Sequence, residues 1–335
     1  MKIRILAFLA FIFIFIGPLK ARATDLYALM DPGDGRVEYN FYLSYEKVDG
    51  IALRLRWAEI EPKDNVYNWN KIDDAVKQAY KYRKGLTLHI LPSSYVAPPS
   101  WLEDAGMEEY RASFPLKYGR SNSYEPVPWD KVYLEKWEEF MAALAEHLNE
   151  PKALASLKYI SVAAPVPEMS LIYCRDNKMS SSLGYSREWY LYSWKKTIEI
   201  MRKYFPRPTK LLPVPVDQIC RPDNDGPAFF SEVYRFAGAG FMPFATDLNG
   251  YGSKRLKGIP QDLYNASGLQ FIWQYTIDPK KTKRKRFAGE LKDGVCKGVL
   301  DYKGDYFEVY QDDLNNTDFP VRRAIQKIKS PASCD

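Results

Sequence analysis

The chain has 335 residues and a formal net charge of +6, with 46% hydrophobic and 27% charged residues. Four of its basic residues lie within the first 23, so the rest of the chain carries 44 basic and 42 acidic residues, a net charge of +2. A balance this close to neutral argues against general binding to nucleic acid. The remaining length, about 312 residues, is long for an ordinary domain but suits a single α/β barrel.

The N-terminus has the pattern of a secretory signal peptide. Two basic residues precede an apolar run at 5–17, and Ala21-Arg22-Ala23 offers a small-x-small cleavage site. An uncleaved membrane anchor is the alternative, but the run is short for a spanning helix, and no later stretch is apolar enough. We therefore predict a signal peptide at 1–23, cleaved after Ala23, and a secreted or periplasmic protein at 24–335 without stable membrane insertion.

The rest of the chain repeats one unit, which consists of an apolar strand, a loop and an amphipathic helix. The predicted strands are residues 26–30, 50–57, 85–91, 158–164, 210–216, 241–248, 269–275 and 306–310. The predicted helices are residues 71–83, about 132–148, 186–204, 227–237, a short one near Gln261, and 321–329.

Eight strands that alternate with helices, without a Ser/Gly-rich linker, indicate a parallel sheet closed on itself. A doubly wound open sheet is the alternative, but no Gly-rich phosphate loop follows the first strand. We therefore predict an α/β fold, a single (β/α)₈ TIM barrel.

Four cysteines are present, Cys174, Cys220, Cys296 and Cys334. Their spacing fits no zinc pattern, so we predict no metal and no other cofactor. After export, disulfides would persist. Three pairings are open to the sequence. In the predicted barrel Cys174 and Cys220 follow adjacent strands, which favours their pairing and leaves Cys296–Cys334 to hold the C-terminus.

The most specific motif lies in and after the second strand. It reads R-x-x-W, then E-P, then Y-x-W, then D, and consists of Arg54, Trp57, Glu61-Pro62, Tyr67, Trp69 and Asp73. This motif resembles the second strand of the retaining glycoside hydrolases of clan A, which are (β/α)₈ barrels, and is closest in style to family 42 β-galactosidase-like members. Asn65 stands where the family usually has glycine, a change that still permits a left-handed turn.

The same motif supplies two candidates for substrate binding. A cation on a buried strand is costly unless paired, so we expect Arg54 at the barrel mouth beside an active-site carboxylate; a structural ion pair with a helix is the alternative. Trp57 presents a flat apolar face suited to stacking on a sugar, although it could equally fill the core. His89, in the third strand, is either a polar residue of the barrel top or a hydrogen-bonded core histidine.

The fourth strand ends at Pro165 and Pro167, which cannot donate to a ladder. Glu168 follows directly, at the end of the barrel where chemistry is done. In clan A the fourth strand ends with the general acid/base glutamate, so the resemblance implies that role for Glu168; a solvated loop glutamate is the alternative. Pro167-Glu168-Met169 resembles a divergent, poorly characterised subgroup with S-E-M in place of N-E-P, so the asparagine that would bond the sugar 2-hydroxyl is missing.

A second carboxylate is needed, about 5–5.5 Å from the acid in retaining enzymes and about 6.5–9.5 Å in inverting ones. The clan places it at the end of strand seven, but residues 269–275 contain glutamines and no acid, and an amide is too weak a nucleophile. Glu308, flanked by apolar residues in strand eight, is our first substitute. Asp247, at the end of strand six, is the second.

Other residues near the strand ends are predicted to hold the sugar. Trp101, with Pro99, resembles the P-x-W loop whose tryptophan walls the sugar site, and Trp273 resembles the tryptophan floor. The predicted substrate-binding residues are Arg54, Trp57, Tyr95, Trp101, Asn249, Trp273 and Gln274.

Three functions follow from this pattern. The first is an exported glycoside hydrolase that cleaves β-linked oligo- or polysaccharide. The second is a carbohydrate-binding pseudoenzyme, because the strand-seven acid is missing while Glu168 and the tryptophans remain. The third is a secreted structural protein on a reused barrel, since fold does not fix function. The sequence leaves the sugar, the stereochemical outcome and the oligomeric state open.

Overall fold

The computed structural model describes residues 24–30, 39–92, 98–107, 109–112, 123–162, 184, 186–214, 226–248, 251, 253, 256, 259–264, 268–271, 291–311, 314, 325–330 and 334. Within this part of the chain, no helix has both the length and the apolarity needed to cross a bilayer.

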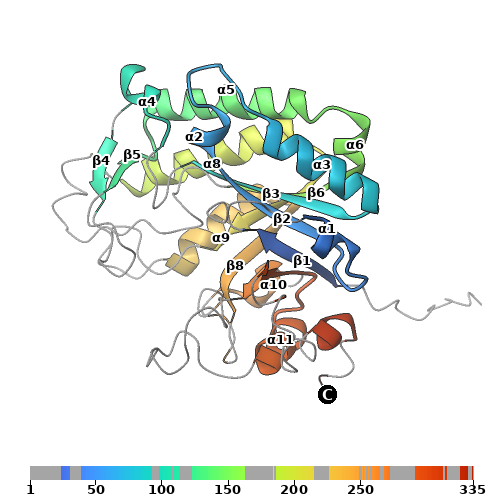
Figure 1. Cartoon of the computed structure of the whole chain (residues 1–335). Coiled ribbons are helices and arrows are strands. Elements are labelled where there is room, and N and C mark those ends of the chain that lie inside the picture. Colours follow the sequence, from blue (N-terminus) through green and yellow to red (C-terminus); the bar gives the residue numbers. More distant parts are fainter. Residues whose placement is uncertain are drawn as a thin grey trace, which may run out of the picture.

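Eight parallel strands close into a barrel, as predicted (Figure 1). They are β1 (Asp25–Met30), β2 (Gly50–Arg56), β3 (Gly85–Leu91), β6 (Leu157–Ser161), β7 (Thr209–Pro213), β8 (Phe241–Leu248), β9 (Gly268–Phe271) and β10 (Tyr306–Tyr310). Each strand pairs with the next barrel strand along the chain, and β10 closes the ring by pairing with β1.

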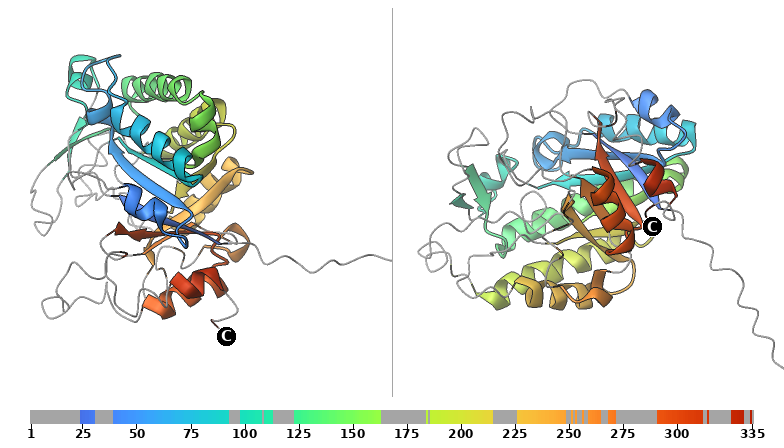
Figure 2. Two further views of the ribbon diagram at one scale, coloured as in Figure 1. Left: turned by 45° about the vertical axis from the view of Figure 1, so that its right-hand side comes forward. Right: turned by 90° about the horizontal axis from the view of Figure 1, so that it is seen from below.

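Helices cover the outside of the barrel. The longer ones are α3 (Asn70–Tyr82), α5 (Lys131–His147), α8 (Arg187–Tyr204), α9 (Gly226–Ala237) and α11 (Leu291–Leu300). Figure 1 shows α5 and α8 lying side by side on one flank, and the two helices are in contact. In the left view of Figure 2, helices lie above the strands and, in the red C-terminal part, below them. One continuous apolar core fills the space between the sheet and this layer.

Several short elements were not predicted from the sequence. They are α1 (Tyr39–Ser44), α2 (Trp57–Ile60), α4 (Trp101–Asp104), α6 (Pro151–Ser156) and the antiparallel hairpin of β4 (Glu109–Ala112) and β5 (Ser123–Pro126). The short helix predicted near Gln261 is confirmed as α10 (Gln261–Tyr264). In Figure 1, α2, α4 and the hairpin lie at the same end of the barrel, beyond the carboxyl ends of the strands. Trp57, predicted as the last residue of a strand, instead begins α2.

Helix α11 was also missed, and its glycines explain why. Two glycines in ten residues lower the helix propensity of the segment. Gly298 is needed for packing, because a Cβ at this position would lie 2.7 Å from the ring of Phe307 on β10. Cys296 of the same helix is disulfide-bonded to Cys334, which confirms that predicted pair. Cys174 and Cys220 lie outside the described residues.

The barrel interior is filled by alternate residues of the strands, as the period of two requires. At the amino ends of the strands the filling side chains are tyrosines: Tyr27, Tyr159 and Tyr306 lie with ring centroids 4.3 to 5.6 Å apart. Tyr27 has room because its neighbours on β2 and β3 are Gly50 and Gly85, where any Cβ would overlap its ring or hydroxyl. Polar residues follow towards the carboxyl ends.

Candidate active site

Alternate residues of β10 connect across the barrel interior to β2 and β3 in three successive contacts. Nearest the amino ends, the Tyr306 hydroxyl lies 2.8 Å from Thr87 Oγ1. In the middle, Glu308 Oε1 lies 2.6 Å from His89 Nε2. Nearest the carboxyl ends, Arg54 Nη1 lies 3.2 Å from the Tyr310 hydroxyl. We call these three contacts the interior ladder.

The middle contact of the ladder pairs two fully buried titratable groups. His89 and Glu308 both have exposed fractions of 0%, and the imidazole stacks on Phe244 with ring centroids 5.5 Å apart. Glu308 Oε1 also accepts a hydrogen bond of 2.5 Å from the Tyr306 hydroxyl. A buried carboxylate is tolerated when donors of this kind compensate for lost hydration. His89 is therefore the hydrogen-bonded core histidine of our two alternatives.

Two polar atoms of this pair lack partners among the residues that the structure describes. They are Glu308 Oε2 and His89 Nδ1, and the buried hydroxyl of Ser161 on β6 also lacks a partner among these residues. Burial, together with the charge of Glu308, raises the pKa of Tyr306 well above its ordinary value, so the phenol remains a donor to Glu308 across the neutral range. The barrel interior therefore contains polar atoms that could still form hydrogen bonds, at a level just below Arg54 and Tyr310.

Arg54 forms the ladder contact nearest the carboxyl ends. It pairs in register with His89 on the neighbouring strand, and its guanidinium carbon lies 5.6 Å from the centroid of the Tyr310 ring. Such a cation–π contact, with the hydrogen bond to the Tyr310 hydroxyl, helps to compensate the cost of burying a cation that is 4% exposed. Arg54 thus lies towards the carboxyl ends of the strands with the Tyr310 phenol as its partner, and its predicted pairing with an active-site carboxylate stays a prediction.

The motif after β2 builds a rigid loop around Glu61. This buried carboxylate accepts hydrogen bonds from Trp57 Nε1 at 2.6 Å and from the backbone N–H of Asn65 at 2.8 Å. Asn65 has a φ of 59°, so it adopts the left-handed conformation that the sequence allowed. Burial raises the pKa of Glu61, and the two hydrogen bonds oppose part of that rise. The glutamate of the E-P pair therefore organises the loop.

Trp57 lies inside this structure and is 0% exposed. Its ring packs edge-on against Trp137 of α5, stacks on Phe140 and meets Trp101 edge-on at 5.8 Å. Because no part of the side chain is exposed, the geometry favours the core-filling interpretation over sugar stacking. Trp101 is partly exposed, and its Nε1 donates to the backbone carbonyl of Glu61 at 2.9 Å.

Asp247 is directed towards a different neighbourhood. Its Oδ1 lies 2.5 Å from the Ser253 hydroxyl, and Ser253 in turn bonds through its backbone N–H to the hydroxyl of Tyr302. Tyr302 packs against the core between the sheet and the helices. Asp247 is thus bonded to Ser253 in the segment after β8, whereas Glu308 belongs to the interior ladder.

The other predicted site residues lie outside the described residues: Tyr95, Glu168, Asn249, Trp273 and Gln274. Their placement stays a prediction. Within the described ranges, no group of three or more histidine, cysteine or acidic side chains is arranged to hold a metal ion.

Sequence reasoning missed three members of the ladder, Thr87, Tyr306 and Tyr310. The signal was present in β10, because the period of two in Y-F-E-V-Y puts both tyrosines on the same face as Glu308. Which residues of β2 and β3 these side chains contact could not be predicted from local sequence, because the contacts join residues more than 200 positions apart.

Clan A glycoside hydrolases, which the motif after β2 resembles, share this closed eight-stranded barrel, and a comparison with known proteins finds the same resemblance. Residues 50–159 match the model of the beta-galactosidase family, glycoside hydrolase family 42. This segment runs from β2 into β6 and includes the Arg54–Asp73 motif. The predicted resemblance to family 42-like barrels is thus confirmed. No curated protein matches significantly.

Solved structures agree at the level of fold. The catalytic domain of beta-amylase from Paenibacillus polymyxa aligns with a TM-score of 0.56 at 10% identity, over 93% of this chain and 99% of that one. Xylanase 10B from Thermotoga maritima gives 0.55 at 11%, over 93% and 96%. Beta-galactosidase from the psychrophilic Marinomonas ef1 gives 0.55 at 9%, over 92% of this chain and 59% of that one. At 9–11% identity, these neighbours show a shared fold.

Proposed function

We propose that this protein is an exported glycoside hydrolase that cleaves β-linked oligo- or polysaccharide at the carboxyl end of its barrel. The observation that carries the proposal is the family match over residues 50–159. It ends within β6, the strand that directly precedes Glu168 in the sequence. Catalytic groups of (β/α)₈ barrels come from the ends of such strands.

In the proposed mechanism Glu168 is the general acid that protonates the leaving glycosidic oxygen. A partly apolar surrounding would raise its pKa enough to keep it protonated near neutrality. A second carboxylate then acts from the other side of the sugar, either as a nucleophile or as a base towards water. Retaining and inverting enzymes differ in the separation of the two carboxylates, so the stereochemistry of the product has to be determined by experiment.

We favour Glu308 over Asp247 as the second carboxylate. Glu308 lies in the barrel interior beside His89, whereas Asp247 bonds to Ser253. Because Glu308 has no exposed surface, this role requires Arg54 and Tyr310, the next contact of the ladder, to move when a sugar binds. Because substitution of a buried carboxylate can also destabilise the fold, the activity of a Glu308 variant must be compared with that of a Glu168 variant.

The burial of Glu308 also favours a second candidate, a carbohydrate-binding pseudoenzyme. The segment 269–275 contains no acid, and the best substitute elsewhere is enclosed by the ladder. A protein of this kind would bind sugars through its remaining aromatic residues but would not hydrolyse them.

Activity on a panel of aryl glycosides and polysaccharides separates the two candidates. We expect turnover by the wild type and, for substrates with poor leaving groups, a loss of about 10²- to 10⁴-fold in Glu168→Gln, the usual contribution of a positioned acid or base. Glu150→Gln, a change at an exposed glutamate, is the matched control and should retain activity. Sugar binding without turnover by either wild type or Glu168→Gln would establish the pseudoenzyme instead.

Export is a separate part of the proposal. It is supported by the composition of residues 1–23 and by the Cys296–Cys334 disulfide, because disulfides persist in oxidising compartments. Mass spectrometry of the protein recovered outside the cytoplasm should give a chain that begins at Thr24. Recovery of the intact chain from the cytoplasm with reduced cysteines would contradict export.

A further inference from the structure

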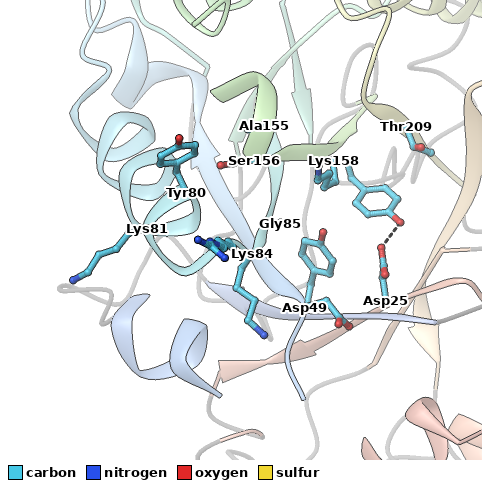
Figure 3. A pocket seen from close by; sticks show the side chains of 13 residues that line it. Asp25, Asp49, Tyr80, Lys81, Lys84, Gly85, Ala155, Ser156, Lys158 and Thr209 are labelled. Carbon is cyan, nitrogen blue, oxygen red and sulfur yellow. Dashed lines mark hydrogen bonds between the residues drawn. The ribbon is translucent and has the colours of Figure 1, made fainter. Parts of the chain in front are cut away.

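A cavity of about 790 Å³ opens at the amino ends of the barrel strands, opposite the proposed active site. Its walls come from the first residues of β1, β3, β6 and β7, from the end of α3 and from α6 (Figure 3). The volume falls within the range of small-molecule binding sites. The pocket is made entirely of residues that the structure describes, and neither the motif nor the proposed mechanism uses it.

The floor of this pocket contains a buried phenol without a protein partner. Tyr27 is 1% exposed and lines the cavity. In the part of the chain that the structure describes, its hydroxyl forms no hydrogen bond, whereas the neighbouring Tyr159 hydroxyl donates to Asp25 Oδ2 at 2.7 Å. Gly85 lies directly beside the Tyr27 hydroxyl, because a Cβ at Gly85 would be 1.8 Å from it. Because Tyr27 lines the cavity, this donor is available to a ligand that enters it.

The charge around the cavity is predominantly positive. Four cations line it, Lys81, Arg83, Lys84 and Lys158. Lys84 is held by the backbone carbonyls of Glu46 and Val48. The other three form no ion pair with a carboxylate within the described ranges.

The two acids of the pocket are already engaged. Asp25 accepts from Tyr159, and Asp49 accepts from the Leu26 backbone N–H and from Lys329. Asp49 is paired with a cation, whereas Asp25 keeps its charge because its donor, Tyr159, is a neutral phenol. An entering anion would still meet more cations than carboxylates in the wall, four against two. The burial of Tyr27 raises the pKa of its phenol, which keeps the hydroxyl protonated as a donor.

We propose that this pocket binds a small organic anion about the size of a monosaccharide. Its carboxylate or phosphate group faces Arg83 and Lys158 and accepts a hydrogen bond from the Tyr27 hydroxyl. Tyr80 and Tyr159 supply aromatic edges for the rest of the molecule. The site is independent of glycoside hydrolysis, since it lies at the other end of the barrel.

Isothermal titration of the full chain with glucuronate, glucose 6-phosphate and neutral glucose tests the proposal. We expect saturable binding of at least one of the two anions and none of glucose, and the stronger anion identifies the recognised group. Binding should weaken as salt rises, because the cations at the rim are exposed. The absence of saturable binding for both anions, or equal binding of glucose, would overturn the proposal.

Three variants assign the binding to this cavity. Tyr27→Phe removes a hydroxyl without a protein partner, so it should fold with unchanged stability and bind about tenfold more weakly, as expected for a hydrogen bond to a charged acceptor. Lys158→Ala should also weaken binding at least about tenfold through loss of the unpaired cation. Lys77→Ala on α3, outside the pocket, is the control and should bind as the wild type does. Wild-type affinity in both Tyr27→Phe and Lys158→Ala would show that the anion binds elsewhere.

Discussion

His89 Nε2 and Glu308 Oε1 lie 2.6 Å apart across the interior of the barrel, joining β3 to β10 over 219 residues of sequence. Both side chains are fully buried, and the Tyr306 hydroxyl supplies a second donor to the same carboxylate oxygen. The pair connects opposite parts of the sheet just below Arg54 and Tyr310. The His89–Glu308 contact therefore both stabilises the barrel and positions Glu308, the proposed second carboxylate.

Removing either partner of this pair should be strongly destabilising. His89→Phe leaves the buried Glu308 with fewer donors, at a cost of about 3–5 kcal/mol. Glu308→Leu leaves His89 Nε2 without its acceptor, at about 1–3 kcal/mol. The double variant should be more stable than the sum predicts, with a coupling of about 1–3 kcal/mol in urea unfolding. Strict additivity of the two changes would mean that the groups do not interact.

The loop around Glu61 predicts a pH-dependent stability. The pKa of Glu61 is raised by burial, so its stabilising contribution is present below the unfolded value, about 4.3, and is lost as pH rises through the raised value. Glu61→Gln cannot ionise, and its free energy of unfolding relative to wild type should therefore improve from pH 4 to pH 8. Urea unfolding at several pH values measures this difference. A decline over that range would have the wrong sign.

Trp57→Phe provides a related test of the same loop. The change keeps an aromatic ring in the cluster but removes the donor to Glu61 Oε2. We expect a loss of about 1–3 kcal/mol, and the loss should grow with pH because that hydrogen bond favours the ionised carboxylate. If Trp57 instead served mainly to bind sugar, stability would stay close to wild type while substrate affinity fell.

Glu138 on α5 should show the opposite dependence of stability on pH from Glu61. Hydrogen bonds from Lys196, and next from Lys203, lower the pKa of Glu138, outweighing its partial burial; they join α5 to α8 at 2.6 and 3.1 Å. The contribution is present above the unfolded value and is lost as pH falls through the lowered one. Glu138→Gln should cost about 1 kcal/mol at pH 7 and progressively less towards pH 3. An equal cost at both pH values would exclude an ionic origin.

The Cys296–Cys334 disulfide should stabilise the C-terminal part of the barrel. It closes a loop with a sequence separation of 38, for which chain entropy gives about 4 kcal/mol. The Cys296→Ser/Cys334→Ser variant should therefore unfold at lower denaturant concentration than wild type under oxidising conditions. Under fully reducing conditions the two proteins should differ much less, and a difference that persists there would point to packing of α11 instead.

Much of the fold could be predicted because its signals are local. The eight strands follow from apolar runs and the longer helices from amphipathic periods, and the left-handed Asn65 follows from the turn chemistry of one residue. The β4–β5 hairpin was missed because its strands are only four residues long and ten residues apart, and α11 was missed because its two glycines lower helix propensity.

The candidate site was harder to predict, because its contacts are long-range. Glu308 could be chosen from its apolar neighbours, but His89 as its partner depends on how the barrel closes. Trp57 illustrates the opposite difficulty. A tryptophan at the end of a strand suits both a sugar platform and a core, and only the packing of α5 against it decides between them.

The most direct test of the account is the dependence of hydrolysis on leaving-group acidity. If Glu168 donates a proton to the glycosidic oxygen, kcat/KM of Glu168→Gln should fall by about 10²- to 10⁴-fold for substrates with poor leaving groups and remain near wild type for 2,4-dinitrophenyl glycosides, which need no acid. An equal loss for both kinds of substrate, or no loss for either, would contradict the role of Glu168 as the acid.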